Sequence, residues 1–267
     1  MIKNFIKPDT IEQACKLVKD QLVKDQKDKV GYFGNGVFLN NPHYPVKYET
    51  AISLKNLGLN NIKEGTVNGQ KGLKIGSMLT FQTIIDEPNI PDILKQAAKH
   101  EYSRPIRNMK TLGGDINVST HSSHFSPTLV ALSALVELKG EDWMPFEAYK
   151  NTSQRELITN IFLPDSNIKC NVKRLSLNTH MPTIVSVAAA LDNQDKKIIV
   201  AIGGIADGIE KNIIHLSDLE EQTDKISYIE KAVTKDLIPD HDSELHGSNE
   251  YIKYVTGVVV ADCIKSL

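Results

Sequence analysis

Apolar residues recur at helical spacing close to the N-terminus of the chain. Ile11, Ala14 and Val18 lie on one face of a helix if the segment is helical. Thr10 and Gln13 have the spacing of a capping box, in which Gln13 reaches back to the Thr10 amide. The pattern therefore predicts an amphipathic helix that begins near Thr10.

Short apolar runs bounded by glycine and polar residues predict strands through the rest of the chain. These strands are a run that ends at Phe33 and the ranges 48–54, 72–76, 136–138, 157–163, 174–177, 184–191 and 197–202. Helices are predicted over 91–100, from Ser126 as N-cap with Pro127 as the first helical residue, over 216–220 and 226–235, and from Ser248 onward. The last helix is expected to turn Tyr251, Val255, Val258, Val259 and Cys263 inward.

Composition argues against several classes of protein, namely nucleic-acid-binding, secreted, membrane-spanning and iron–sulfur proteins. The chain has 267 residues and a formal net charge of −2, so it has no basic excess that would indicate nucleic-acid binding. The apolar part of the N-terminus is too short for a signal peptide, and no apolar run predicts a membrane span. We expect a cytoplasmic protein. Its three cysteines are far apart in sequence, so the chain is not expected to hold an iron–sulfur cluster.

Two histidine-containing segments raise the question of a metal site. They are His121-Ser122-Ser123-His124 and the run 240–246. A metal site needs more ligands and a preorganised scaffold, so solvated or cofactor-edge histidines are the preferred interpretation for the first segment. A solvated charged loop before the last helix is the preferred interpretation for the second. Arg104 and Arg107 have two interpretations that stay open, contact with a phosphate or partner surface and an ion pair or cap within the domain.

The segment Phe33-Gly34-Asn35-Gly36-Val37-Phe38 places a glycine turn at the end of a predicted strand. Such a turn can direct several main-chain N–H groups at a phosphate. Asn-Gly is also a common hairpin signal, and that alternative stays open on the residues alone. The segment lacks the third glycine and the following helix of a Rossmann fingerprint.

A second glycine segment runs from Ile106 to Asn117 and contains Thr111, Gly113 and Gly114. Glycine lets the backbone approach a ligand closely, and successive N–H groups in such a turn form an anion-binding concavity. Double glycines also occur in ordinary turns, so this segment needs support from its surroundings.

That support comes from a longer match. Residues 102–132 resemble the second flavin-binding segment of the FAD-binding (medium) subunits of molybdenum hydroxylases, of the xanthine dehydrogenase and carbon monoxide dehydrogenase type. The family pattern "(I/V)RN-x-A-T-I-G-G-N-I-A" fits 106–117 and "P-x-L-L-A-L-x-A" fits 127–134 without a gap. Residues 33–38 resemble the family's first FAD segment. Further similar stretches are 75–80, 156–164, 184–190 and 247–254.

The resemblance implies an α+β fold. A PCMH-type FAD-binding domain of two α/β subdomains would occupy residues 1–165. A smaller domain, similar to the C-terminal domain of carbon monoxide dehydrogenase flavoproteins, would occupy 170–267 and hold a three-stranded antiparallel sheet with helices. The polar, turn-rich segment 164–170 is the predicted boundary. The expected FAD-binding residues are Phe33, Gly34, Asn35, Gly36, Val37, Phe38, Thr111, Gly113, Gly114, Asp115, Ile116, Asn117, Ser123 and His124.

The resemblance also implies a function and partners. The chain would carry electrons from a [2Fe–2S] subunit, served by a molybdopterin-containing large subunit, through FAD to NAD⁺ or another acceptor, with no catalytic side chain of its own. Two alternatives remain, a stand-alone FAD-dependent reductase and a degenerate scaffold subunit without flavin. The second is motivated by departures from the family pattern at His124, Ser53 and Met181, and the pattern also differs at His121 and Ile252.

Overall fold

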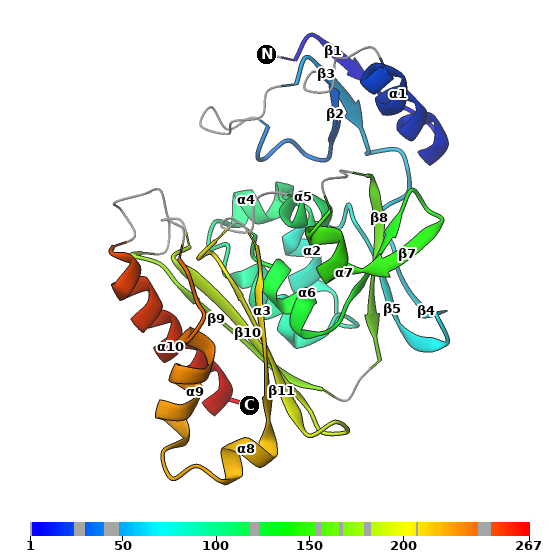
Figure 1. Cartoon of the computed structure of the whole chain (residues 1–267). Helices are drawn as coiled ribbons and strands as arrows, with labels where there is room; N and C mark the ends of the chain where they lie inside the picture. Colours follow the sequence, from blue (N-terminus) through cyan, green and yellow to red (C-terminus); the bar gives the residue numbers. More distant parts are fainter. Residues whose placement is uncertain are drawn as a thin grey trace.

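The computed structural model describes residues 2–23, 30–39, 48–117, 123–152, 156–165, 168–178, 183–206, 208–239 and 247–267. Its N-terminal part is a small parallel sheet in the order β1-β3-β2 with one helix against it (Figure 1). The bounds are β1 (Asn4–Ile6), α1 (Ile11–Val23), β2 (Val30–Phe33) and β3 (Thr50–Ser53). Ala14 of α1 packs on Val30 and Ile52, as its helical spacing predicted. The capping contact differs by one residue, because Gln13 Oε1 accepts from the Asp9 amide at 2.9 Å.

The middle of the chain forms a five-stranded antiparallel sheet in the order β4-β5-β8-β6-β7. Its strands are β4 (Ile62–Val67), β5 (Gln70–Gly76), β6 (Leu135–Leu138), β7 (Asp142–Pro145) and β8 (Ile158–Pro164). The helices of this part are α2 (Phe81–Asp86), α3 (Asp92–Lys99), α4 (Arg104–Met109), α5 (Leu112–Ile116), α6 (Ser126–Ala131) and α7 (Phe146–Lys150). Helix α6 begins at Ser126 itself, with Phe125 as its N-cap, so the predicted capping position is one residue late.

The C-terminal part is an antiparallel sheet with helices, and it has four strands rather than the predicted three. The order is β12-β11-β10-β9, from β9 (Lys169–Leu175), β10 (Val185–Asp192), β11 (Lys197–Gly203) and β12 (Glu210–His215). The missed strand, β12, is an edge strand. Of its residues only Ile214 is buried, so its sequence shows little of the apolar pattern by which strands are recognised.

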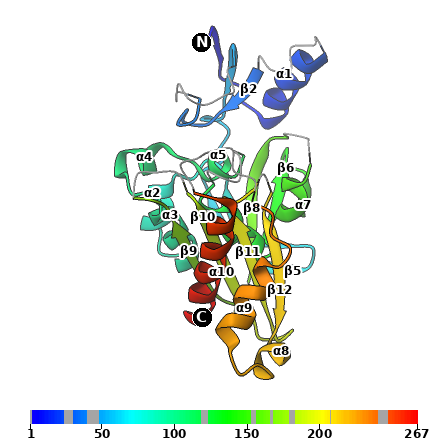
Figure 2. The same cartoon turned by 60° about the vertical axis from the view of Figure 1, so that its left-hand side comes forward.

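Helices cover both faces of this sheet (Figure 2). Residues of α9 (Lys225–Thr234) and α10 (Asn249–Lys265) pack on one face, and α8 (Leu216–Glu220) joins them. The other face packs on α6 and α3, in one apolar cluster that continues to the five-stranded sheet. The C-terminal sheet is thus joined to the middle part by a shared core.

The last helix begins where the sequence predicted, with Ser248 as its N-cap. Its buried side is only partly the predicted one. Val255 and Cys263 are buried, whereas Tyr251 and Val258 are exposed and Ile252 is buried in their place. The neighbouring helix α9 decides which side faces inward, and that contact is not visible in the spacing of the residues. Among the described residues, no helix is long and apolar enough to cross a membrane.

Candidate functional site

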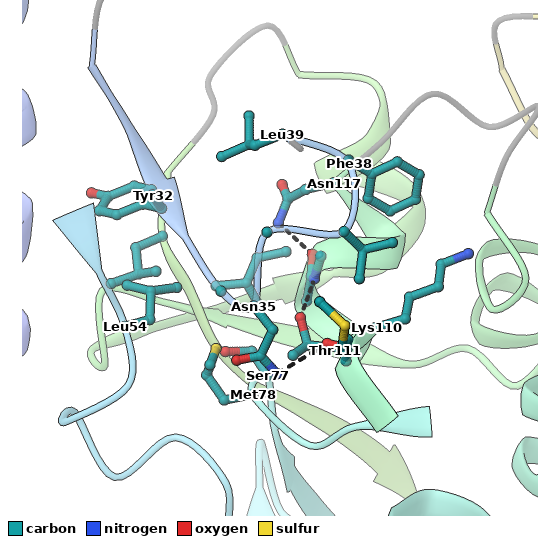
Figure 3. Close-up of a pocket in the computed structure, with 18 of the residues that line it drawn as sticks. Tyr32, Asn35, Phe38, Leu39, Leu54, Ser77, Met78, Lys110, Thr111 and Asn117 are labelled. Atoms are coloured by element: carbon teal, nitrogen blue, oxygen red, sulfur yellow. Dashed lines mark hydrogen bonds between the residues drawn. The ribbon is translucent and has the colours of Figure 1, made fainter. Parts of the chain in front are cut away.

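A pocket lies between the N-terminal parallel sheet and the middle part of the chain (Figure 3). The N-terminal side of its wall consists of Tyr32, residues 34–39, Tyr48 and Leu54. The opposite side consists of Ser77, Met78, residues 109–111, Gly113, Gly114, Asn117 and residues 156–158. Both glycine segments of the sequence therefore line one pocket, although more than 70 residues separate them.

The first glycine segment is an open turn directly after β2. Gly36 has a φ of 77°, a left-handed conformation that glycine adopts without strain. Strand β2 pairs with β3 in parallel, so the Asn-Gly pair is not a hairpin turn, and that alternative is wrong. Within the described part of the chain, the main-chain N–H groups of residues 34–37 donate to no acceptor.

The turn is fixed to the second glycine segment by one side chain. Asn35 Nδ2 donates to the Met109 carbonyl at 2.9 Å, and Figure 3 shows this contact as a dashed line. The free N–H groups of the turn are thus held at a fixed place on the wall of the pocket.

The second glycine segment is organised differently from the prediction. Its residues form the short helix α5, with Thr111 as N-cap. The Gly113 amide donates to the Ser77 carbonyl at 2.7 Å, and the Gly114 amide donates to Thr111 Oγ1 at 3.1 Å. These two N–H groups are not available to an anion, because the helix cap and the neighbouring strand end already use them. The expected concavity of N–H groups belongs to the first segment alone.

Close packing explains the glycines of the second segment. A Cβ on Gly113 would lie 2.8 Å from Ser77 Cβ and 3.0 Å from the Ser77 carbonyl oxygen. A Cβ on Gly114 would lie 2.8 Å from Thr111 Oγ1, and one on Gly34 would lie 3.2 Å from the same oxygen. The two segments therefore meet at the Thr111 hydroxyl, where side chains at positions 34 and 114 would crowd both the hydroxyl and the pocket.

Not every predicted FAD-binding residue reaches the pocket. Those on its wall are Gly34, Asn35, Gly36, Val37, Phe38, Thr111, Gly113, Gly114 and Asn117. Phe33, Asp115, Ile116, Ser123 and His124 do not line it. The Phe33 ring stacks edge-on against Phe5 with 5.2 Å between centroids. Asp115 is fully buried, and its carboxylate accepts from the Ser123 hydroxyl at 2.9 Å and from the His124 and Phe125 amides.

A buried ion pair lies beneath the second glycine segment. Lys110 Nζ is 2.9 Å from Asp115 Oδ1 and 2.9 Å from His124 Nδ1. The ammonium also lies 5.1 Å from the centre of the Phe38 ring and 5.0 Å from that of Phe81. Although Lys110 lines the pocket, its side chain extends away from Thr111 and Asn35 (Figure 3). The Lys110 ammonium is thus paired with Asp115 inside the protein and does not face the pocket.

The protonation states of this cluster follow from its geometry. Burial raises the pKa of Asp115, but the Lys110 charge and the hydrogen bonds from His124 and Lys110 outweigh burial, so the net shift is downward. Burial and the Lys110 charge lower the pKa of His124. His124 Nδ1 lies between Lys110 Nζ, at 2.9 Å, and Asp115 Oδ1, at 3.2 Å, and the lowered pKa favours the neutral imidazole at pH 7. The cluster therefore holds one positive and one negative charge around a neutral imidazole.

Several pocket residues carry no sequence signal that would have identified them. Tyr32, Leu54, Met78 and Met109 are ordinary core or surface types, and only the fold brings them to one wall. Ser77 lies in a stretch that resembles the family, yet nothing in that stretch marks it as a pocket residue. Its hydroxyl is buried and has no hydrogen-bond partner among the described residues.

Arg107 makes its contacts within the domain, as the second of its two interpretations expected. Its Nε donates to Gln82 Oε1 at 3.0 Å, and its Nη1 donates to the Glu101 and Tyr102 carbonyls. The guanidinium thus ties α4 to α2. Of the two histidine segments, 121–122 and 240–246 lie outside the described residues. Elsewhere, no group of three or more histidine, cysteine, aspartate or glutamate side chains in the described ranges is placed to hold a metal ion.

His100, at the C-terminal end of α3, yields a pH prediction. Burial, with smaller contributions from His124 and Arg174, lowers the pKa of His100 to about 4, and its Nδ1 has no partner among the described residues. The unfolded chain takes up a proton near pH 6.5, and the native state does so only near pH 4. The contribution of His100 to the free energy of unfolding is therefore fully present above pH 6.5 and is lost as the pH drops toward 4. The loss is roughly 2 kcal/mol between pH 7 and 5. Urea unfolding at both pH values measures the loss.

His100→Asn should reduce that loss, and the exposed His215→Asn should leave it unchanged. An equal loss in the His100→Asn variant would assign the pH dependence to other groups, with His124 as the first to examine.

Comparison with known proteins identifies the family of the chain and agrees with its fold. Residues 1–166 match the family described as the FAD binding domain in molybdopterin dehydrogenase, and the chain belongs to this family. The protein YgfM of Escherichia coli K12 is 32% identical over 262 residues, which cover 98% of this chain and 95% of YgfM. The glyceraldehyde dehydrogenase medium chain of Sulfolobus acidocaldarius is 25% identical over 220 residues, or 73% of this chain and 76% of that one.

Solved structures share the fold over the whole length. A chain of quinoline 2-oxidoreductase from Pseudomonas putida 86 aligns with a TM-score of 0.81 at 16% identity, covering 100% of this chain and 96% of that one. A chain of carbon monoxide dehydrogenase from Hydrogenophaga pseudoflava aligns with a TM-score of 0.82 at 18% identity, covering 99% and 96%. The predicted family and fold class are thus confirmed. The chain is an FAD-binding component of a molybdenum hydroxylase-type oxidoreductase, and FAD is its cofactor.

Proposed function

We propose that this chain is the electron-transfer flavin subunit of a cytoplasmic molybdenum hydroxylase complex. It would accept electrons from the [2Fe–2S] clusters of one partner subunit, which a molybdopterin-containing large subunit supplies, and pass them to NAD⁺ or another acceptor. The observation that carries the proposal is the pocket on which both glycine segments converge. FAD, when bound, supplies the conversion between one-electron and two-electron transfer.

The donors on the pocket wall fit the phosphates of FAD. The free N–H groups of residues 34–37 form a concavity that suits an anion. The Thr111 hydroxyl accepts from Gly114, so its own proton remains available to a ligand. The missing Cβ atoms of Gly34 and Gly114 leave room beside these donors. We assign the phosphate end of FAD to this junction.

Five predicted residues receive a supporting role in this proposal. Asp115, Ser123 and His124 hold one another and the start of α6 in place behind the pocket. Ile116 is a core residue beside them, and Phe33 ends the strand that leads into the first turn. They would position the binding residues without touching the cofactor.

An exposed apolar stripe beside the pocket supports a partner chain. Helix α4 buries none of its residues. Ile106 and Met109 are three residues apart on this helix and are 39% and 45% exposed, and Tyr102, which precedes the helix, is 50% exposed. Met109 also lines the pocket, so a protein docked on this stripe would lie at the rim of the flavin site. Several large exposed apolar residues within one short segment are typical of interaction sites.

The test is to purify the chain from its own cells under native conditions and to identify the proteins that accompany it. We expect FAD at one equivalent per chain, together with an iron–sulfur chain and a molybdopterin-containing chain. Substrate-dependent reduction of NAD⁺ should require all three. Turnover of NADH by the isolated chain would instead favour a stand-alone reductase. An isolated chain that takes up no FAD, even from excess, would favour the scaffold alternative.

A further inference from the structure

Ser77 is a polar side chain of the pocket wall that the fold leaves unsatisfied. It follows β5 directly and is 2% exposed. Its amide donates to the Thr159 carbonyl at 2.9 Å, and its carbonyl accepts from Gly113 at 2.7 Å. Its hydroxyl has no partner within the described part of the chain. The backbone of Ser77 is therefore fixed, while its side chain has hydrogen-bonding capacity that nothing in the protein uses.

A buried hydroxyl without a partner lowers the stability of the protein that contains it, so an unused one calls for a reason. Ser77 lies at the junction of the two glycine segments. Its Cβ is next to Gly113, and the following residue, Met78, places its sulfur 3.5 Å from the Cβ position of Gly34. A donor at this place adds to the N–H groups of the first turn and to the Thr111 hydroxyl, and all of these favour a negatively charged ligand.

We propose that the Ser77 hydroxyl donates a hydrogen bond to a phosphate oxygen of the FAD pyrophosphate. This inference rests on the proposed placement of the phosphate end of FAD at the glycine junction. The present rotamer of Ser77 makes no hydrogen bond, so a rotation about χ1 toward the ligand gives up none. The hydroxyl, which has no partner among the described residues, thus gains one in the complex, and this hydrogen bond becomes part of the affinity for FAD.

Two measurements, the stability of the apoprotein and the affinity for FAD, distinguish Ser77 from a residue that acts only in packing. Ser77→Ala removes the unsatisfied group from the empty protein and the hydrogen bond from the complex. We expect the melting temperature of the apoprotein to rise by about 2–4 °C. We also expect the dissociation constant for FAD to increase about tenfold, the effect of losing one hydrogen bond to a charged group. Loss of packing alone would lower both stability and affinity.

Ser186 supplies a matched control. It is another buried serine whose hydroxyl lacks a partner among the described residues, but it lies on β10 and does not line the pocket. Ser186→Ala should raise the melting temperature in the same way and leave the affinity for FAD unchanged. Both variants remove one buried serine hydroxyl, but only Ser77 lines the pocket.

The experiment measures binding of FAD, ADP and riboflavin to the refolded apoprotein by calorimetry, for the wild type and both variants. FAD and ADP contain the pyrophosphate, and riboflavin contains neither phosphate. The proposal expects Ser77→Ala to weaken FAD and ADP equally and to leave riboflavin unaffected. Unchanged binding of FAD, an equal effect of Ser186→Ala, or a loss that extends to riboflavin would each overturn it. If the wild type binds riboflavin but not ADP, the placement of the phosphates fails first, and the assignment of Ser77 fails with it.

Discussion

Gly114→Leu is expected to remove bound FAD while the protein stays folded. A Cβ at position 114 meets only Thr111 Oγ1, at 2.8 Å, and residue 114 lines the pocket. The leucine side chain would therefore extend into the space between the two glycine segments. Overpacking of a fitted site costs about 1–3 kcal/mol, which weakens FAD binding by roughly ten- to a hundredfold. Flavin absorbance of the purified protein, with FAD counted after heat release, measures the loss.

The neighbouring glycine gives a variant with the opposite pattern. At position 113 a side chain meets Ser77 Cβ at 2.8 Å and the Ser77 carbonyl oxygen at 3.0 Å, and backbone cannot move aside cheaply. Gly113→Leu should therefore lower the melting temperature as well as the flavin content. Gly208→Leu is the neutral control, because no atom lies within 4 Å of its Cβ position. A Gly114→Leu protein with the FAD content of the wild type would show that the phosphates bind elsewhere.

These expectations differ from those that the sequence allowed. Glycine turns and apolar periodicity are local signals, so both glycine segments and most strands could be predicted from nearby residues. Whether each N–H group finds an acceptor within the protein depends on residues that are distant in the sequence. The Gly113 amide is taken by the carbonyl of Ser77, which belongs to the end of another strand. For the same reason the sequence could not distinguish the first segment, with its free donors, from the second, whose donors are engaged.

The charged residues show the same limit. His124 was expected among the FAD-binding residues, and nothing in the sequence distinguished Lys110 from the neighbouring Arg104 and Arg107. Lys110 and His124 belong to a buried cluster with Asp115, because the fold brings positions 110 and 124 into contact with position 115. In the family pattern the residue at position 110 is alanine and that at 115 is asparagine. Lys110, Asp115 and His124 depart from the family pattern and contact one another, so we infer that these departures compensate for one another within this chain.

Lys110→Met is expected to destabilise the protein by about 3–5 kcal/mol at pH 7, the cost of leaving one partner of a buried ion pair uncompensated. The Asp115 side chain is inaccessible to solvent and would keep only its hydrogen bonds to Ser123, His124 and Phe125. Urea unfolding measures the change. Lys3→Met is the matched control, because Lys3 pairs with Glu49 on the surface and such exposed pairs contribute about 0–1 kcal/mol.

The pH dependence of this loss has a definite sign. In the wild type the pKa of Asp115 lies below its unfolded value, so its contribution to stability is present above pH 4 and is lost only in strong acid. Without Lys110, burial dominates and raises the pKa of Asp115 above the unfolded value. The penalty of the variant is then largest near neutral pH and shrinks as the pH falls toward 4. Removal of Lys110 also makes His124 easier to protonate, which acts in the same direction.

The double variant Lys110→Met/Asp115→Asn completes the argument. It removes both charges and returns position 115 to the asparagine of the family pattern, so no ion is left buried. We expect it to be more stable at pH 7 than Lys110→Met alone, with a coupling energy of roughly 1–3 kcal/mol between the two positions. Its stability relative to the wild type should no longer change between pH 7 and 5. Additive effects of the two substitutions would show that Lys110 and Asp115 act independently, and the compensation inferred from positions 110 and 115 would then be wrong.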